Sequence, residues 1–434
     1  MPQWCQLMAS LRIGPAAAIE GRYRPPSDKS LTHRALMFGA IASGVSRVRS
    51  PLGSEDAEAT RRCLEATGLR VEAVEDGWLL HPSEWHAPEG VLDCGNSGTT
   101  MRLLSGLIAS RPLTATLAGD ASLSRRPMGR IAEPLRLMGA RVEGDRPPIT
   151  IHGGSLQGIR YATPIASAQI KSCILLAGLR AEGTTTVEEE TLTRDHTERM
   201  LDACGVQMDR QREGERHIVS LRGGQTVQPF DFAVPADISS AAFFMVAAAL
   251  LPAARLTLED VGVNPARTGV LDVFDQAGVK WFAEAHRDQM GEPVADLTIQ
   301  DGGDLRPFEI GGGLVPRLID EIPVLAVMAT QCDGVSVIRD ASELRVKESD
   351  RIERVAEGLR AMGARVETRE DGMEIEGPVQ LRGATIQTDG DHRIGMAFAV
   401  AGLIAHGETV IEGSEAIQTS FPAFADDLWK LTYA

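Results

Sequence analysis

The stretch SDKSLTHRALMFGAIASGVSRVRS, residues 27–50, carries three features in a fixed order. A polar cluster around Lys29 and Ser30 is followed by a helix-length run that is apolar on most faces, and then by a Gly and a strand-like segment. The cations near the start of this helix, Lys29 and Arg34, are unexpected, because the first turn of a helix carries the positive end of its dipole. A cation placed there indicates an anion close by.

The same pattern returns five times along the chain. The later copies lie at residues 95–120, 166–190, 236–260, 319–340 and 390–413. The predicted helix starts are near residues 30, 98, 169, 239, 320 and 393, a spacing of roughly 70 to 80 residues. A recurrence at this period is typical of a protein assembled from repeated structural units.

A second signature alternates with the first. It is an amphipathic helix whose last turn is closed by a Gly, followed by a strand, at residues 64–71, 135–142, 201–208, 274–281 and 359–366. Gly readily adopts the left-handed conformation that such a helix end requires. One helix ending in Gly means little by itself, but five copies interleaved with the first pattern indicate true repeats, and a sixth begins at Phe424.

Each unit is therefore predicted to run strand, buried helix, strand, surface helix, strand, strand. The short segments VLDCGN, IRYATP, FDFAVP and ATIQTD, which begin at residues 91, 159, 230 and 384, fit the opening strand. The last unit ends before its closing strands, and residues 11–26 can supply them. This gives an α/β fold of six βαβαββ repeats in two lobes of three.

The repeats also predict the domain boundaries. Residues 1–24 and 236–434 are expected to form the C-terminal lobe, with units four to six, and residues 25–235 the N-terminal lobe, with units one to three. The chain would cross between the lobes near residues 23–27 and 234–238. Two adjacent crossings predict a hinge, and ligands favour the cleft beside a hinge.

Composition narrows the class of protein. The chain has 434 residues with a net charge of −16 and 43% hydrophobic residues, which is typical of a globular protein. The negative charge disfavours a nucleic-acid or anionic-membrane partner. The N-terminus shows no signal peptide, and the longest apolar run, residues 241–251, is too short for a bilayer of about 30 Å.

The cysteines and histidines predict no metal centre and no disulfide framework. The six cysteines form no CxxC pair, which indicates reduced thiols and a cytoplasmic location. The nine histidines show no HExxH spacing, so a zinc site is not expected. There is also no P-loop or GxGxxG sequence, so the motifs indicate neither of these nucleotide sites.

Polar residues gather at the predicted starts of the buried helices. Ser, Asn, Asp and Thr are ordinary N-caps there, but Lys29, Arg34 and Arg393 are not. Free backbone N–H groups, the helix dipole and a guanidinium or ammonium group together make a phosphate or carboxylate site. Further basic clusters lie at residues 124–130 and 342–351, although the second also fits a charged helix start with spaced ion pairs.

Seven of these motifs, in their order along the chain, resemble the 5-enolpyruvylshikimate-3-phosphate synthase family. They are DKSLTHRAL, GNSGTTMRL, RRPMGR, ASAQIKSCILLAGL, TRDHTERML, LRVKESDR and GDHRIGMAFAV, which begin at residues 28, 95, 125, 166, 193, 344 and 390. The resemblance implies the two-lobed fold called an inside-out α/β barrel. It also implies that the 5-hydroxyl of shikimate 3-phosphate displaces phosphate from phosphoenolpyruvate by addition and elimination, without a metal or other cofactor.

The resemblance assigns roles to individual residues. The implied groups for shikimate 3-phosphate are Lys29, Ser30, Arg34, Ser167, Ala168, Gln169, Arg194, Asp320 and Lys347. Those for phosphoenolpyruvate are Lys29, Asn96, Gly98, Arg126, Gln169, Arg351 and Arg393. The implied proton-transfer groups are Asp320, Glu348 and Lys29. Such groups need to lie within about 3 Å of the proton that they move.

The chain departs from the family pattern at a few positions. Ser27 replaces the usual Gly before the first polar pair, and Thr419 stands near the place of a lysine found in one subgroup. The pattern resembles the bacterial subgroup termed class II, some tolerant members of which have Ala where this chain has Gly98. We therefore expect glyphosate to compete with phosphoenolpyruvate here. We also expect a monomer.

Two alternatives remain at this point. One is the sister transferase that acts on UDP-N-acetylglucosamine, which typically has Lys-Asn at the first motif and a Cys in a lid loop. Here the pair is Lys29–Ser30 and the loop at residues 122–130 has no Cys. The other is a non-catalytic anion-binding repeat protein, which the presence of Asp320 and Glu348 disfavours.

Overall fold

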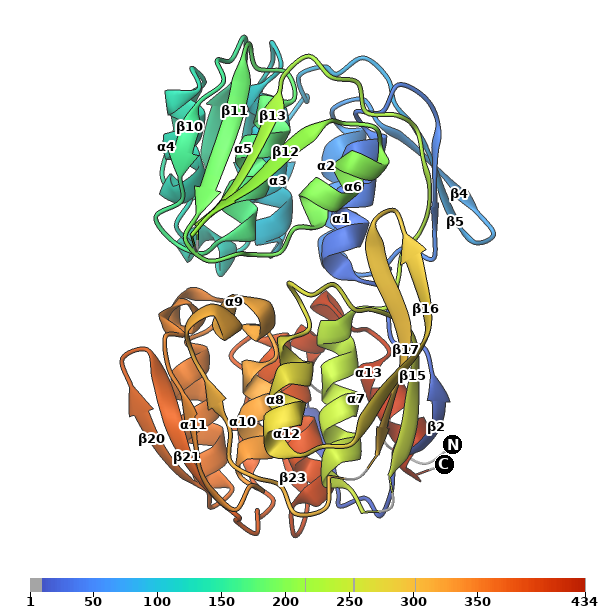
Figure 1. The fold of residues 1–434 in the computed structure, drawn as a ribbon, viewed down its shortest axis with the longest axis vertical. Helices are drawn as coiled ribbons and strands as arrows, with labels where there is room; N and C mark the ends of the chain where they lie inside the picture. The colour runs from blue at the N-terminus through green and yellow to red at the C-terminus, as the bar shows by residue number, and fades with distance from the viewer. Residues whose placement is uncertain (1–9, 215, 253, 301, 434) are drawn as a thin grey trace. The chain divides into compact units, whose positions relative to one another are not determined.

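The computed structural model describes residues 10–214, 216–252, 254–300 and 302–433 (Figure 1). Trp4, Cys5 and the rest of the first nine residues, on which the expectations about the N-terminus rest, lie outside these ranges. The chain divides into two compact units. Unit 1 contains the described residues up to Pro26, Ala236–Arg287 and the chain from Pro293, and unit 2 contains Ser27–Pro235 and Asp288–Glu292.

Unit 2 holds three sheets of four strands. Their orders are β14-β3-β5-β4, β6-β7-β9-β8 and β10-β11-β13-β12. The strands are β3 (Ser46–Arg49), β4 (Arg70–Val74), β5 (Gly77–His81), β6 (Leu92–Asp93), β7 (Thr114–Ala118), β8 (Arg141–Glu143), β9 (Ile149–His152), β10 (Arg160–Ala162), β11 (Thr184–Glu189), β12 (Met208–Glu213), β13 (Arg216–Arg222) and β14 (Asp231–Ala233). In each sheet the first two strands are parallel and the later pairs antiparallel.

Unit 1 repeats this arrangement with one smaller sheet. The orders are β16-β17-β15-β2, β18-β19-β21-β20 and β1-β23-β22. The strands are β1 (Ser10–Ile13), β2 (Glu20–Tyr23), β15 (Arg255–Gly262), β16 (Trp281–Gln289), β17 (Glu292–Gln300), β18 (Glu309–Ile310), β19 (Gly334–Ile338), β20 (Arg365–Arg369), β21 (Gly372–Gly377), β22 (Thr385–Gln387) and β23 (Thr409–Glu412). The described residues thus form six small sheets, and the predicted α/β class of six repeats is confirmed.

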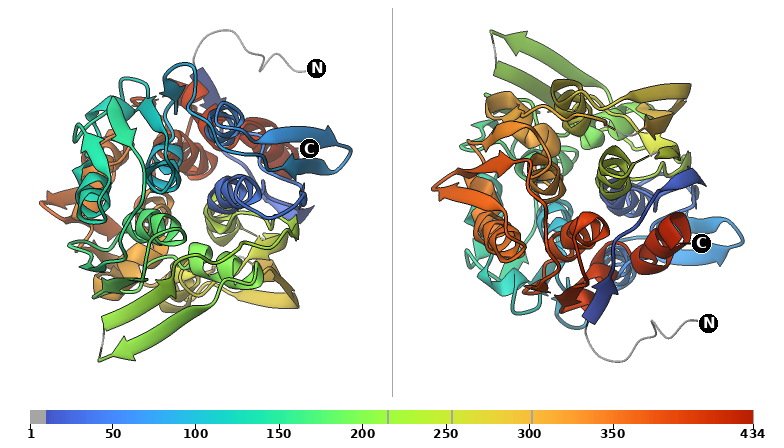
Figure 2. Two further views of the ribbon diagram at one scale, coloured as in Figure 1. Left: turned by 90° about the horizontal axis from the view of Figure 1, so that it is seen from above. Right: turned by 90° about the horizontal axis from the view of Figure 1, so that it is seen from below.

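The buried helices form where the first signature placed them. They are α1 (Lys29–Gly39), α3 (Gly98–Ala109), α5 (Ala168–Gly178), α7 (Ile238–Leu250), α10 (Ile322–Ala329) and α12 (His392–Ile404). All side chains from Ile238 to Ala249 in α7 are buried, as are those from His392 to Leu403 in α12. Figure 2 shows helices end-on with strands outside them. Each unit has its own hydrophobic core.

The second signature gives the outer helices. They are α2 (Glu55–Glu65), α4 (Gly129–Leu137), α6 (His196–Ala203), α8 (Gly269–Ala277), α11 (Arg351–Ala361) and α13 (Phe424–Tyr433). Gly278 closes α8 with φ of +83°, and its N–H donates to the carbonyl oxygen of Phe274. A glycine with positive φ also follows α2, α4, α6 and α11, at Gly68, Gly139, Gly205 and Gly363. The left-handed glycines predicted from the sequence are therefore confirmed.

The remaining elements are short. They are the 3-10 turns η1 (Leu123–Arg125), η2 (Gly312–Leu314), η3 (Ser342–Val346) and η4 (Ser414–Thr419), and the one-turn helix α9 (Val315–Leu318). Every helix within the described ranges falls short of the length and hydrophobicity that a bilayer crossing requires.

Two strands pair in sheets that the sequence did not predict. β14, expected to open the unit of α7, pairs in parallel with β3, and β2 pairs in parallel with β15. The expectation that the N-terminal segment closes the last repeat holds for β1, which pairs with β23, but is wrong for β2. The reason is that the chain changes units directly after each of these strands, so each strand stays in the unit that it leaves.

The assignment of the turn between β16 and β17, with the adjoining strand ends, was also not expected. Asp288–Glu292 belongs to unit 2, although both flanking segments belong to unit 1. Within unit 2, Nδ1 of His196 lies 2.8 Å from Oε1 of Glu292, and Nη1 of Arg199 donates to the carbonyl oxygen of Gly291 at 2.9 Å. Both His196 and Glu292 are buried. The sequence pattern gave no sign that residues 288–292 belong to unit 2, because they lie within the two strands predicted to close one repeat.

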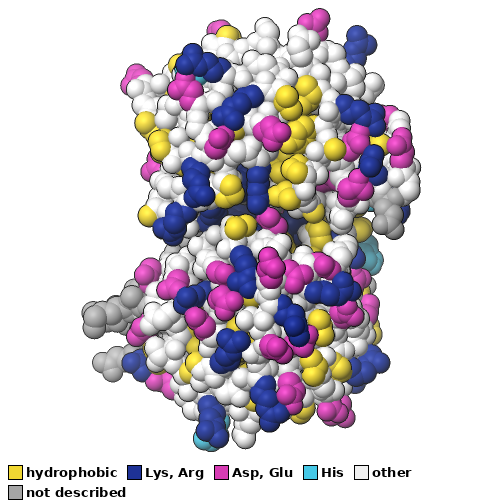
Figure 3. All heavy atoms as spheres, turned by 90° about the vertical axis from the view of Figure 1, so that its left-hand side faces the viewer, with side chains coloured by type: hydrophobic (Ala, Val, Ile, Leu, Met, Phe, Trp, Pro, Cys, Tyr) yellow, Lys and Arg dark blue, Asp and Glu magenta, His cyan; other side chains and the backbone are white. Residues whose placement is uncertain are grey.

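Acidic and basic side chains are interspersed over the face that Figure 3 presents. Many of the ion pairs are exposed, such as that between Arg365 and Glu376 at 2.5 Å. Exposed pairs of this kind contribute between zero and about 1 kcal/mol each. The buried charge clusters described below are therefore the ones that need a structural or functional explanation.

Candidate active site

Capping residues position the starts of the buried helices. The carboxylate of Asp28 accepts from the N–H of Leu31 at 2.8 Å, and Oγ of Ser97 accepts from the N–H of Thr100 at 3.1 Å. Asp237 and Asp391 cap α7 and α12 in the same way. Ser167 precedes α5 but makes no such side-chain bond. The ordinary capping role expected for these residue types is thus correct for four of them, and the Ser167 hydroxyl is not used as a cap.

Lys29 has a partner that the sequence did not reveal. Its Nζ lies 3.0 Å from Oδ2 of Asp56 in the first turn of α2. The side chain is 18% exposed, so the ammonium is held in a fixed place but remains accessible. The anion inferred from the unusual position of Lys29 therefore includes a carboxylate of the protein itself. Ser30 is the next residue of α1, and its carbonyl oxygen accepts from Nη1 of Arg34 at 3.0 Å.

Arg34 is buried, with 3% of its surface exposed. Its Nε donates to Oγ1 of Thr197 at 2.8 Å, and Nη2 donates to Oγ of Ser172 at 3.0 Å. Burial and, to a smaller extent, the positive charge of Arg194 lower the pKa of Arg34 to about 10, against the opposing effect of nearby carboxylates. The charges of the two guanidinium groups thus disfavour each other, which is a setting that stabilises a bound anion.

A second basic group surrounds the start of α3. Nη2 of Arg126 donates to Oδ1 of Asn96 at 2.7 Å, and Nδ2 of Asn96 donates to Oδ2 of Asp120 at 2.6 Å. A Cβ atom added at Gly98 would lie 2.8 Å from Nη1 of Arg102 and 3.3 Å from Nη1 of Arg126. The absence of a side chain at Gly98 therefore leaves the room that these two guanidinium groups occupy.

Gln169 connects this group to α5. Its Oε1 accepts from Nη1 of Arg102 at 2.5 Å, and its Nε2 donates to Oγ1 of Thr99 at 3.0 Å. The structure thus brings together Asn96, Gly98, Arg126 and Gln169, to which the family resemblance assigns substrate binding. It adds Arg102, which sequence reasoning missed because a charged residue one turn into a helix is usually exposed to solvent.

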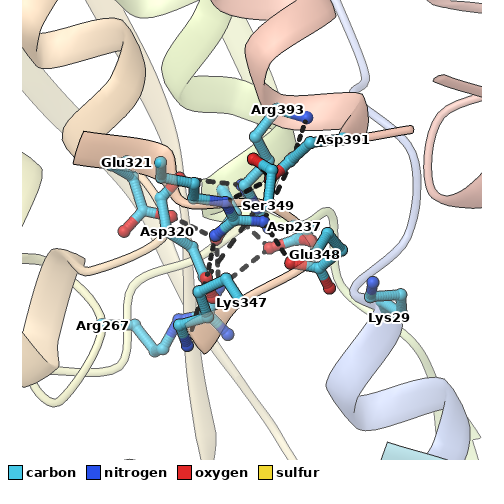
Figure 4. A network of polar contacts seen from close by, with 12 residues as sticks. Lys29, Asp237, Arg267, Asp320, Glu321, Lys347, Glu348, Ser349, Asp391 and Arg393 are labelled. Atoms are coloured by element: carbon cyan, nitrogen blue, oxygen red, sulfur yellow. Dashed lines mark hydrogen bonds and ion pairs between the residues drawn. The ribbon is translucent and has the colours of Figure 1, made fainter. Parts of the chain in front are cut away.

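The site residues of unit 1 surround one arginine. Nε of Arg351 donates to Oδ2 of Asp391 at 2.8 Å, Nη1 to Oδ1 of Asp320 at 3.2 Å and Nη2 to Oε2 of Glu348 at 2.6 Å. Figure 4 shows Asp320, Glu348 and Asp391 converging in this way. Burial alone would lower the pKa of Arg351, but the three carboxylates outweigh it and raise this pKa above its ordinary value.

Two further cations lie beside Asp320. Nη1 of Arg393 donates to the carbonyl oxygen of Asp320 at 3.1 Å, and Nζ of Lys347 lies 4.0 Å from Oδ1 of the same residue. Asp320 therefore has cationic neighbours from three elements, with Arg351 on α11. It precedes α10, which begins at Ile322, close to the predicted start near residue 320. Pro323 lies in the first turn of this helix, where proline is well tolerated.

A buried chain of polar groups continues behind Asp320. Nη2 of Arg267 donates to Oδ1 of Asp237 at 3.1 Å and to Oγ of Ser239 at 2.6 Å. Ser239 also donates to Oε1 of Glu321, which is completely buried. Asp237 and Ser239 were predicted as polar groups of a helix start, whereas Arg267 was not singled out. Nothing in its local sequence distinguishes it from a surface arginine.

The two groups of residues have different chemistry. In unit 2, cationic and amide side chains lie at helix N-termini, which is how proteins hold phosphates and carboxylates. In unit 1, carboxylates lie beside a lysine and two arginines, an arrangement suited to moving protons while charge develops on a substrate. No group of three metal-binding side chains is found within the described residues.

The fold and these clusters define a class of protein: an α/β protein of six small sheets with cationic and amide side chains at the N-termini of its buried helices. The family model for EPSP synthase (3-phosphoshikimate 1-carboxyvinyltransferase) matches residues 13–428. This chain therefore belongs to the EPSP synthase family.

Individual relatives agree with this assignment. A 3-phosphoshikimate 1-carboxyvinyltransferase of Bacillus thuringiensis subsp. konkukian is 48% identical over 422 residues, which cover 95% of this chain and 97% of the relative. An EPSP synthase structure from Acinetobacter baumannii is 44% identical with a TM-score of 0.86 and covers 98% of both chains. The enolpyruvyl transferase NikO from Streptomyces tendae has a TM-score of 0.78 at 18% identity and covers 97% of this chain and 96% of its own, which shows the shared fold.

Proposed function

We infer that this protein transfers the enolpyruvyl group of phosphoenolpyruvate to the 5-hydroxyl of shikimate 3-phosphate and releases phosphate. It is a transferase of the shikimate pathway and of aromatic amino acid biosynthesis. The family match over residues 13–428 is the observation that carries this conclusion. The clusters in units 1 and 2 support it, because the two substrates carry phosphates and carboxylates that need cationic partners.

In the proposed site, the groups of unit 2 bind the substrates. Ser167, Ala168 and Gln169 at the start of α5 hold shikimate 3-phosphate together with Ser30, Arg34 and Arg194. Asn96, Gly98 and Arg126 hold phosphoenolpyruvate, and Lys29 contacts both substrates. The free N–H groups at the starts of α3 and α5 add hydrogen bonds to the anions.

The groups of unit 1 carry the proton transfers in this proposal. Asp320 accepts the proton of the 5-hydroxyl, whose oxygen then attacks C2 of phosphoenolpyruvate, while Glu348 protonates C3. The resulting tetrahedral ketal loses a proton from C3 and releases phosphate, which restores the double bond. Lys347, Arg351 and Arg393 stabilise the negative charge that develops on the carboxylate and phosphate. Lys29 is the third candidate for proton transfer.

Phosphate release tests this function directly. The protein is incubated with phosphoenolpyruvate and either shikimate 3-phosphate or UDP-N-acetylglucosamine, and inorganic phosphate and the product mass are measured. We expect release with shikimate 3-phosphate and the mass of its enolpyruvyl ether. Release with UDP-N-acetylglucosamine alone would instead identify the sister transferase, and no release with either acceptor would contradict the proposal.

A further inference from the structure

Helix α5 carries a completely buried lysine that the proposed mechanism does not use. Nζ of Lys171 lies 2.7 Å from Oε2 of Glu189 and 2.8 Å from Oε1 of Glu198. It also donates to the carbonyl oxygen of Thr193 at 3.5 Å. Glu189 ends β11 and Glu198 lies in α6, so the ammonium group joins three segments of unit 2.

The charges in this cluster depend on one another. Burial alone lowers the pKa of Lys171, but Glu198 and Glu189 outweigh it and raise this pKa to about 12. The lysine is therefore charged at neutral pH. Because all three side chains are buried, removing the ammonium would leave two carboxylates without their shared counter-ion, which is strongly unfavourable.

The same cluster fixes the loop between β11 and α6. Oγ1 of the buried Thr193 donates to Oε1 of Glu189, so the loop is held by Lys171 at its carbonyl and by Glu189 at its hydroxyl. The next residue in this loop is Arg194. The chain is therefore attached immediately before Arg194, at Thr193, and shortly after Arg194, at Glu198.

The next residue of α5 holds the second arginine of this region. Oγ of Ser172 accepts from Nη2 of Arg34 and lies 2.7 Å from Oγ1 of Thr197 on α6. Of these two adjacent residues, Lys171 therefore contacts the loop that carries Arg194, and Ser172 contacts Arg34 itself. Gln169, a proposed substrate-binding group, lies on the turn just before them.

We propose that Lys171 is a positioning residue for the shikimate 3-phosphate site, because it anchors the loop of residues 190–195, which carries Arg194 directly before α6, the helix whose Thr197 contacts Arg34. Guanidinium groups that bind one anion repel each other, so the segment that carries each of them has to be held by the surrounding structure until the anion arrives. Lys171 supplies that constraint through Glu189, Thr193 and Glu198. This inference rests on the proposed function of the same site.

A double-mutant cycle tests the proposal with the full chain. Lys171→Met is expected to raise the KM for shikimate 3-phosphate by about tenfold, with a change in the KM for phosphoenolpyruvate of less than about twofold. In the Arg194→Ala background the same change is expected to add less than about twofold, since the residue on which Lys171 acts is gone. Independent, multiplying effects of the two changes would overturn the proposal, as would equal rises in both KM values.

A milder variant keeps the test informative if Lys171→Met does not fold. Thr193→Val retains the shape of the side chain and removes its donation to Glu189. We expect the KM for shikimate 3-phosphate to rise by about threefold. The matched control is Thr186→Val on β11, which removes a 2.9 Å contact with Ser220 on the same sheet and should leave both KM values unchanged. A similar rise in the control, or none in Thr193→Val, would contradict the proposal.

Hydrogen exchange separates this inference from the proposed function. Faster exchange at residues 190–195 is expected in Thr193→Val and Lys171→Met, and not in Thr186→Val, whatever the enzyme's turnover. Wild-type protein that releases no phosphate from the two substrates would refute the function. Unchanged exchange at residues 190–195 would refute the anchoring role even in an active enzyme.

Discussion

Two buried arginines, Arg34 in unit 2 and Arg351 in unit 1, lie in opposite electrostatic surroundings. Arg34 donates to two hydroxyls and a backbone carbonyl, and burial lowers its pKa to about 10. Arg351 donates to three carboxylates, which raise its pKa. Burial disfavours the charge of both, so the partners decide the outcome.

This difference suggests that the two units have different roles in substrate binding and catalysis. The hydrogen-bond partners of Arg34 are uncharged oxygens, so an incoming anion would gain from its positive charge. The positive charge at Arg351 is already compensated, so it serves to hold three acids in place. Unit 2 should then govern the affinity for substrates, and unit 1 should govern the rate of the proton transfers.

The largest expected effect is on turnover. Asp320→Asn and Glu348→Gln keep the shape of each side chain and remove its ability to accept or deliver a proton. We expect kcat to fall by about 10²–10⁴-fold in each variant, with KM values that change little. Steady-state kinetics with both substrates measures this. Near-normal kcat in either variant would reject the catalytic role of that residue, and a rise in KM alone would reverse the division between the units.

A second test concerns stability in unit 1. Asp391→Ala removes both the cap of α12 and the buried partner of Arg351, so we expect unfolding to become easier by about 3–5 kcal/mol. The matched control is Asp350→Ala, which removes the cap of α11 and a partly exposed pair with Arg345, and should cost about 1 kcal/mol. Denaturant unfolding compares the two. Equal losses would mean that the charge on Arg351 needs no buried carboxylate.

The starts of the buried helices could be predicted because their signals are local. An N-cap such as Ser97 and a closing glycine such as Gly278 lie within a few residues of the helix that they define. Lys29, Arg34 and Arg393 were inferred as anion-binding residues from the same signals, since cations are unusual at a helix N-terminus. The family motifs then supplied roles that the residues alone do not reveal.

The remaining features depend on contacts between distant parts of the chain. The parallel pairing of β2 with β15 joins segments more than two hundred residues apart, as the pairing of Tyr23 with Leu258 illustrates. Asp56 supplies the partner of Lys29 from a neighbouring helix, and its sequence context is that of an ordinary acidic helix start. The anchoring by Lys171 was missed for a similar reason, because a lysine in an apolar helix does not reveal which carboxylates face it.

The pH dependence of stability tests the electrostatic surroundings of Arg34 in unit 2. His33 is completely buried beside Lys29 and Arg34, and burial followed by these two charges lowers its pKa to about 3. Its Nδ1 lies 2.6 Å from Oγ1 of Thr60. Below the unfolded-state pKa of about 6.5, the unfolded chain binds a proton at this position that the folded chain does not. His33 therefore makes the fold less stable as pH falls.

The expected size is about 1.6 kcal/mol between pH 6.5 and pH 5, because the slope rises from half of its limit at pH 6.5 towards about 1.4 kcal/mol for each pH unit. Unfolding free energies of the wild type and of His33→Gln, measured across this range, isolate the contribution because all other titrating groups are shared. The variant should lose stability less steeply on acidification. Parallel curves would show that burial and the two neighbouring cations do not hold His33 neutral.

The smallest expected effect concerns the anion site beside Arg126. In Gly98→Ala the new methyl group would lie 2.8 Å from Nη1 of Arg102, so this flexible guanidinium has to move and its contact with Gln169 is disturbed. We expect glyphosate to compete with phosphoenolpyruvate in the wild type, and its inhibition constant to rise by about tenfold in the variant. The KM for phosphoenolpyruvate should rise by less, because the substrate has other cationic partners.

The control for this variant is Gly53→Ala, where an added Cβ atom meets nothing within 4 Å. It should leave both constants unchanged, so that any effect at residue 98 reflects the crowded guanidinium groups rather than the loss of a glycine. An inhibition constant that stays the same in Gly98→Ala would mean that Arg102 moves aside without altering the site. The affinity of unit 2 for this anion would then depend on Arg126 and Lys29, and Arg102 would make no contribution to it.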